Sequence, residues 1–162
     1  MPIPTRLRLP FILLIALSLA GCASNPVTET IITQGEALSR VQASAITTGE
    51  LSVHSMQAVR ILELDELWLS DQEKVRAALE AYEGPDLPLW LRTMALAEVC
   101  YVLADGAGGG QDSLELYVQA TLAAMQAVGD PTEAASLFDP RHRLLAEIYN
   151  RALAEAIEIG QE

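Results

Sequence analysis

The chain has 162 residues, of which 22 are acidic and 10 are Lys or Arg, so its formal net charge at pH 7 is −12. This balance excludes nucleic acid and an anionic lipid surface as expected partners, because an acidic protein surface repels both. The Cys, His, Asp and Glu residues nowhere follow the spacing of a metal-binding motif, so we expect neither a metal nor a cofactor.

The first 22 residues have the parts of a secretory signal. Arg6 and Arg8 form its basic start, and residues 11–20 form an apolar stretch too short to span a bilayer of about 30 Å. The run Leu19-Ala20-Gly21-Cys22 then resembles the lipobox of bacterial lipoproteins. In that family the Cys thiol receives a diacylglyceryl group, and the chain is cut just before the Cys. The resemblance therefore implies cleavage between Gly21 and Cys22, and a mature chain anchored in the bilayer by acylated Cys22.

The residue after the lipidated Cys indicates in which membrane the chain is anchored. In such lipoproteins an Asp there often means retention in the inner membrane, whereas this chain has Ala23. We expect a cell-envelope protein anchored to the periplasmic face of the outer membrane rather than to the inner membrane. The expected parts are a signal peptide over residues 1–21, a lipidated tether over 22–29 and a single helical domain over 30–160.

The residues after the tether predict about six helices. Apolar residues recur at helical spacing, and no segment shows sustained alternation, so we expect an all-α fold without a sheet. The second helix has Ser52 as its cap, the third opens with a capping box at residues 70–73, and the last begins at Asp139-Pro140. The expected ranges are Thr30 to about Thr47, Ser52 to about Trp68, Ser70 to Gly84, Leu87 to Ala104, Asp112 or Ser113 to Gly129, and Asp139 to about Glu158.

Two features indicate how these helices pack. The helix over residues 87–104 is apolar almost all round, which predicts that it is the central buried helix. Ala120, Ala124 and Ala127, followed by Pro131, fall at nearly the spacing of a tetratricopeptide second helix, where small residues let two helices approach closely. We expect antiparallel helical hairpins with a degenerate tetratricopeptide-like (TPR-like) stacking.

Four stretches resemble the amino-terminal helical region of bacterial esterase/lipase-type α/β-hydrolase lipoproteins. They are residues 51–62, Met94–Glu98 with Tyr101, Phe138–Arg141 and Ile148–Leu153, and the likeness covers most of residues 45–157. In that family a hydrolase domain with a nucleophile elbow follows downstream. This chain contains no Gly-x-Ser-x-Gly, so the resemblance implies no catalytic residue within it. Any activity would be carboxylic-ester hydrolysis by a further domain.

The chemically versatile residues have structural interpretations. His54 and His142 are expected in exposed first turns of helices, and Cys100 is expected to be a small buried side chain. Arg141, Asn150 and Arg151 are the candidate interaction residues. Asn150 and Arg151 can hydrogen-bond across helices or meet a downstream domain.

Three readings of function remain open. The first is a membrane-anchored periplasmic lipoprotein whose helical domain is a non-catalytic docking module for a periplasmic protein or a hydrolase domain. The second is the amino-terminal piece of a serine esterase or lipase-type hydrolase. The third is a lipoprotein that binds a small apolar ligand between its helices, suggested by the apolar helix over residues 87–104.

Overall fold

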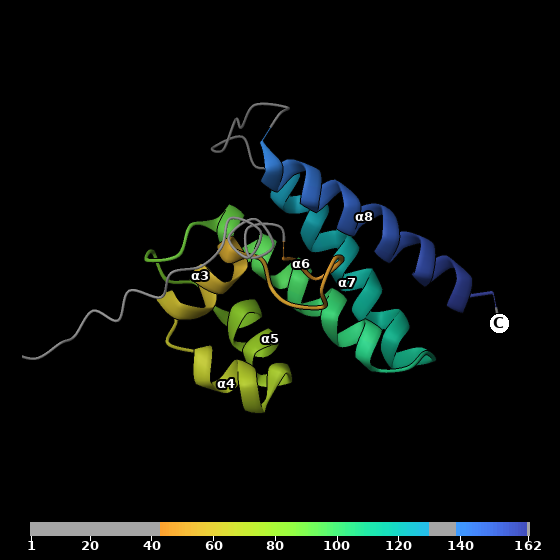
Figure 1. Ribbon diagram of the computed structural model, residues 1–162, viewed down its shortest axis with the longest axis horizontal. Helices are drawn as coiled ribbons and strands as arrows, with labels where there is room; N and C mark the ends of the chain where they lie inside the picture. Colours follow the sequence, from red (N-terminus) through yellow and green to blue (C-terminus); the bar gives the residue numbers. More distant parts are fainter. Residues whose placement is uncertain (1–42, 130–138, 162) are drawn as a thin grey trace, which may run out of the picture. The chain divides into compact units, whose positions relative to one another are not determined.

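The computed structural model describes residues 43–129 and 139–161, and every regular element within them is an α-helix (Figure 1). The predicted all-α class is therefore confirmed for the described residues. The expected signal peptide, the tether and Cys22 lie outside these residues. The helices are α3 (Val53–Ile61), α4 (Asp65–Ser70), α5 (Gln72–Ala81), α6 (Leu89–Gly106), α7 (Gln111–Val128) and α8 (Pro140–Ile159).

Helix α6 is the central element, as its apolar sequence predicts. It packs against α3 and α5 on one side and against α7 on the other, and α7 in turn packs against α8 (Figure 1). Both faces of α6 are buried, because a helix that is apolar all round has no side suited to water. One face belongs to a core shared with α3, α4 and α5, and the other belongs to a core shared with α7 and α8.

Helices α6 and α7 form an antiparallel hairpin, because only a short loop joins them. Gly108, Gly109 and Gly110 in this loop have φ values of 73°, 96° and 86°, a region that residues with a Cβ rarely adopt. The Ser113 hydroxyl closes the loop, since it accepts a hydrogen bond from the Gly109 amide at 3.0 Å and donates one to the Ala104 carbonyl at 3.1 Å. Ser113 thus secures the loop but is not the expected helix cap; Gly110 holds that position.

The other predicted helix caps agree with the structure in two cases and differ in one. Ser52 caps α3 by accepting from the Ser55 amide, and Asp139 caps α8 by accepting from the Arg141 amide, with Pro140 in the first turn. The cap of α5 is Asp71, whose carboxylate accepts from the Lys74 amide at 3.2 Å. The prediction of Ser70 as the cap was wrong, because its hydroxyl instead donates to the carbonyls of Glu66 and Leu67 within α4.

The helix expected from Ser52 to about Trp68 is divided into α3 and α4. Glu63 adopts φ 56°, and the amides of Glu63 and Leu64 donate to the carbonyls of Arg60 and Val59, at 3.0 Å and 2.9 Å. This pair of bonds is the Schellman motif, which ends a helix with one left-handed residue. The chain then changes direction, and Trp68 becomes buried from α4 rather than from α3.

Residues 43–50 do not continue the helix that we expected to reach Thr47. The amides of Thr47 and Thr48 both donate to the Ser44 carbonyl, at 3.1 Å and 3.0 Å, so this segment forms a turn. Residues 30–42 of the expected helix lie outside the described residues. The turn brings Ser44 and Ala45 into buried positions. Ser44 lines the candidate site, and Ala45 joins the core that α6 shares with α7 and α8.

Candidate functional site

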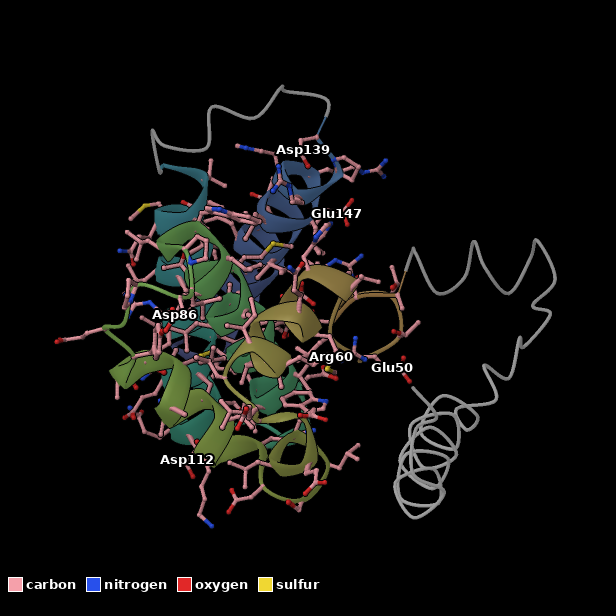
Figure 2. All side chains as sticks on the ribbon, turned by 90° about the vertical axis from the view of Figure 1, so that its left-hand side faces the viewer. Glu50, Arg60, Asp86, Asp112, Asp139 and Glu147 are labelled. Atoms are coloured by element: carbon pink, nitrogen blue, oxygen red, sulfur yellow. The ribbon has the colours of Figure 1, made fainter. Side chains whose placement is uncertain are left out.

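An open groove of about 700 Å³ lies between the start of α3 and the start of α8. We call it the α3–α8 groove. Figure 2 labels Asp139 and Glu147 on α8, and Glu50 and Arg60 on the side of α3. The groove is lined by residues from the turn before α3, from the first turn of α3, from α6 and from the first two turns of α8. They are Ala43, Ser44, Thr47, Ser52, Val53, His54, Met94, Pro140, Arg141, Arg143, Leu144 and Glu147.

The α8 wall of the groove is fixed by the cap of that helix. The Asp139 carboxylate accepts from Arg141 through Nε at 3.0 Å and Nη2 at 2.6 Å, as well as from the Arg141 amide at 2.9 Å. The same guanidinium lies 4.5 Å from the centroid of the Trp90 ring on α6, within range of a cation–π contact. Through these two contacts Arg141 links α8 to α6. Its hydrogen bonds to Asp139 also lower the pKa of that carboxyl to about 2.

The α3 wall is fixed by a buried carboxylate. Glu98 of α6 is fully buried and accepts from the Ser52 amide at 2.7 Å, the Ser52 hydroxyl at 2.5 Å and the Ser55 hydroxyl at 2.8 Å. The backbone of Ala45 supplies a further hydrogen bond. A carboxylate with several donors suits the amino end of a helix, where backbone amides lack partners. We call Glu98, Ser52, Ser55 and Ala45 the Glu98 cluster.

Burial and hydrogen bonding act on the Glu98 carboxyl in opposite directions. Burial raises its pKa, because the charged form loses water, and the hydrogen bonds from Ser52, Ser55 and Ala45 lower it. Burial is the larger effect. None of the buried side-chain nitrogen and oxygen atoms in the described residues lacks a hydrogen-bond partner. The cluster is therefore a satisfied structural joint between α3 and α6, and it shapes one end of the groove.

The sequence did not point to Glu98 as a site residue. Its signal was present, since a Glu stands between Ala97 and Val99 in the most apolar helix of the chain. Such a position predicts a buried carboxyl that needs partners. The partners could not be identified from sequence, because Ser52 and Ser55 lie on another helix, 43 to 46 residues away.

The structure separates the three candidate interaction residues. Arg141 lines the groove, whereas Asn150 and Arg151 lie exposed further along α8. Arg151 hydrogen-bonds to the Tyr101 side chain of α6, and the Tyr101 ring packs edge-on against Tyr117 of α7 at 5.7 Å between centroids.

The remaining chemically versatile residues do not form an acid–base pair with a nucleophile. His54 is exposed at the groove, and His142 is half-buried on α8 outside the groove lining. Cys100 is fully buried as expected, and burial raises the pKa of its thiol to about 12, which disfavours the nucleophilic thiolate. No group of three His, Cys, Asp or Glu side chains among residues 43–129 and 139–161 is placed to hold a metal ion. The groove lining combines apolar side chains with cationic and hydroxyl groups, and this combination is suited to binding a ligand.

No protein-family model, curated protein or solved structure matches this chain. The helices of the described residues include none that is long and apolar enough to cross a membrane.

Proposed function

We propose that this chain is a lipid-anchored protein of the bacterial cell envelope whose helical domain docks a partner protein without catalysing a reaction. The observation that carries the docking function is an exposed apolar stripe on α7. Val118, Leu122 and Met125 follow one another at intervals of four and three residues, so they share one face of the helix. Leu122 and Met125 remain 55% and 56% exposed, although the opposite face of α7 is fully packed.

The neighbouring helix also carries exposed apolar residues. On α8, Leu153 and Ile157 are exposed at an interval of four residues, and Asn150 lies on the same face three residues before Leu153. We call these six residues (Val118, Leu122, Met125, Asn150, Leu153 and Ile157) the α7–α8 face. Exposed apolar side chains that share one face of a helix, with a polar neighbour, are typical of protein interaction surfaces. In arrays of stacked helical hairpins, such a face is the one that a following unit covers.

The resemblance to esterase-type lipoproteins supports one kind of partner, a hydrolase domain. In that family the helical region precedes a hydrolase domain, and the likeness includes Asn150 and Leu153 of the α7–α8 face. A TPR-like stacking of the hairpins belongs to the same proposal. The lipid anchor rests on Cys22 and the signal before it, so docking would hold the partner at the membrane surface.

Three described serine hydroxyls are committed to structural hydrogen bonds, which supports a non-catalytic function. Ser52 Oγ donates to Glu98, Ser70 Oγ donates to the Glu66 carbonyl, and Ser113 Oγ donates to the Ala104 carbonyl. We expect no turnover of short-chain nitrophenyl esters above buffer by the purified chain. Activity that is lost in His54→Ala or His142→Ala would instead make this chain an enzyme.

Crosslinking in intact cells tests the docking proposal directly. A photoreactive amino acid at Leu122 should give one discrete product that contains a protein with an α/β-hydrolase domain, and Met125→Glu should abolish that product. The matched control is the same photoreactive residue at Leu69, which is 87% exposed on α4 and lies outside the α7–α8 face. Products of equal yield from both positions, or a product made only of two copies of this chain, would contradict the proposal.

The anchor has a separate test. Cys22→Ser should leave a precursor that keeps residues 1–21 and no longer partitions into a detergent-rich phase. Normal processing and membrane retention of this variant would show that the lipobox resemblance is misleading. Since the crosslinking reports on the α7–α8 face and the partitioning on Cys22, the two parts of the proposal can fail independently.

A further inference from the structure

The α3–α8 groove lies apart from the α7–α8 face, and its lining combines two kinds of chemistry. Val53, Met94, Pro140 and Leu144 supply apolar surface from three helices. Polar groups of the turn before α3 and of the first turns of α3 and α8 supply the rest. A volume of about 700 Å³ is within the range of roughly 300–1,000 Å³ that small-molecule sites occupy.

The charged groups at the groove stand at the start of α8 and occur in pairs. Arg141 is paired with Asp139 at 2.6 Å, and Arg143 is paired with Glu147 at 3.2 Å. An exposed guanidinium beside apolar surface, such as that of Arg143, is complementary to an anionic head group that carries an apolar chain.

The two guanidinium groups have different roles in this arrangement. Asp139 and the Trp90 ring hold Arg141 in place, and the Asp139 carboxylate balances its charge. Arg143 is 83% exposed, and its ion pair with Glu147 is a surface pair at 3.2 Å. Exposed pairs of this kind contribute only about 0–1 kcal/mol, so Arg143 can exchange Glu147 for a carboxylate at little cost. His54 lies on the facing wall and adds a hydrogen-bonding ring.

We propose that the α3–α8 groove binds a free fatty acid, with the acyl chain against Val53, Met94 and Leu144 and the carboxylate at Arg143. The Glu98 cluster forms the end of the groove, since Ser52 both lines it and donates to Glu98. Glu98 fixes the α3 wall and the cap of α8 fixes the opposite wall, so the site is built before the ligand arrives. This inference does not depend on a protein partner at the α7–α8 face.

Photolabelling of the full anchored chain in membranes tests the proposal. The probes are palmitic acid with a diazirine in its chain and the alcohol of the same length and diazirine position. The acid should label peptides from the start of α3 and the start of α8, and excess palmitic acid should suppress the labelling. The alcohol should label the same peptides about tenfold less, the effect of losing a charge-assisted hydrogen bond.

Two exposed positions give variants that separate the head-group contact from the groove itself. Arg143→Glu should reduce labelling by the acid about tenfold without changing labelling by the alcohol, and Val53→Trp should reduce both by filling the groove. Lys74→Glu is the matched control, because it makes the same charge change on α5, where the side chain is 70% exposed. Thermal unfolding of each variant should match the parent, since neither Arg143 nor Val53 is buried.

The outcomes that would overturn the proposal are distinct from those that support it. Equal labelling by acid and alcohol would mean that the groove accepts apolar chains without regard to charge. Labelling that spreads over the α7–α8 face, or that survives Val53→Trp, would place the ligand elsewhere. A photoreactive amino acid at Val53 that crosslinks to a protein would make the groove a protein-docking site instead.

Discussion

The two faces of α6 pack against their neighbours by different means. The face toward α3 and α5 uses large aliphatic side chains, among them Val99 of α6, Val59 of α3 and Leu79 of α5. The face toward α7 and α8 is built mainly from alanines on all three helices. These alanines are Ala97, Ala104, Ala120, Ala123, Ala124, Ala127, Ala152 and Ala156.

This difference in packing predicts which kind of substitution destabilises each side. Alanine side chains let helix backbones approach closely, so the α7 side is stabilised by close contact and leaves no room for a larger group. Aliphatic side chains each bury more apolar surface, so the α5 side is stabilised by the volume that those side chains fill. Backbone distortion and added volume should therefore damage the α7 side, and removal of volume should damage the α5 side.

A proline in the middle of α7 should have the largest effect. Ala120 is fully buried in the core of α6, α7 and α8, so Ala120→Pro removes a helix hydrogen bond and places a ring in a fully buried contact. We expect a loss of about 3 kcal/mol or more, which would unfold a domain of ordinary stability. Circular dichroism with urea unfolding measures this loss.

The matched control for that variant is Gln111→Pro, at the first position of α7. Proline is tolerated there because its missing amide would have no partner within the helix. Gln111→Pro should keep a helical spectrum and unfold like the parent. The same result for Ala120→Pro would contradict the packing described for α7.

Removal of side-chain volume tests the α5 side. Leu79 is fully buried in the core with α3 and α6, so Leu79→Ala should cost roughly 2–5 kcal/mol. Leu69→Ala deletes the same atoms from a side chain that is 87% exposed and should change little. Equal unfolding free energies for the two variants would show that the α5 side is not packed as tightly as its burial indicates.

Addition of side-chain volume should destabilise the α7 side rather than the α5 side. Ala124 is fully buried between α6 and α8, so Ala124→Leu should cost about 1–3 kcal/mol through forced movement of the helices. Ala77→Leu on the exposed surface of α5 should be neutral, since Leu is nearly as good a helix former as Ala. A stable Ala124→Leu variant would mean that the alanine-rich side holds unfilled space.

Much of this contrast was predictable from the sequence because it follows from local patterns. The apolar run of α6 predicted its burial, and the alanine spacing in α7 predicted close contact. Asp139-Pro140 marked the start of α8, and Gly129 marked the end of α7. Each of these signals lies within one helix, where side-chain spacing and capping chemistry decide the outcome.

The features that sequence analysis missed depend on contacts between distant segments or on weak local preferences. The division between α3 and α4 occurs at Glu63, where neither Gly nor Pro marks a helix end. The Glu98 cluster joins residues more than forty positions apart, so no local pattern contains it. The α3–α8 groove likewise exists only after α3 and α8 are placed on α6.

The α3 side also depends on a polar joint, which makes it sensitive to pH in a way that the α7 side is not. Glu98→Gln keeps the shape of the side chain but replaces one of the two acceptor oxygens by an NH2 group. At neutral pH we expect a loss of about 1–3 kcal/mol, because the NH2 group cannot accept and leaves a buried donor of Ser52 or Ser55 without its partner.

The pH dependence of that loss has a definite sign. Burial raises the folded-state pKa of Glu98 above its ordinary value of 4.5, so the folded chain takes up this proton before the unfolded chain does. The parent should gain stability relative to Glu98→Gln as the pH falls toward 4.5, and the difference should be constant below that value. Urea unfolding of both proteins over this pH range measures the difference between their free energies of unfolding. The other carboxyl groups contribute equally to both proteins, so their contributions cancel in this difference. A difference that shrinks on acidification would mean that the hydrogen bonds outweigh burial.

The smallest expected effect is a gain on the α3 side. Glu63 holds a left-handed conformation that costs a residue with a Cβ roughly 1–2 kcal/mol, whereas Gly adopts it freely. Because Gly also gains freedom in the unfolded chain, Glu63→Gly should raise the free energy of unfolding by only about 0.5–1 kcal/mol. Glu66→Gly, three residues along in the first turn of α4, should lower it, since Gly is a poor helix former. If Glu63→Gly destabilised the chain as much as Glu66→Gly, the Schellman turn would not divide α3 from α4, and one continuous helix would replace the corner that buries Trp68.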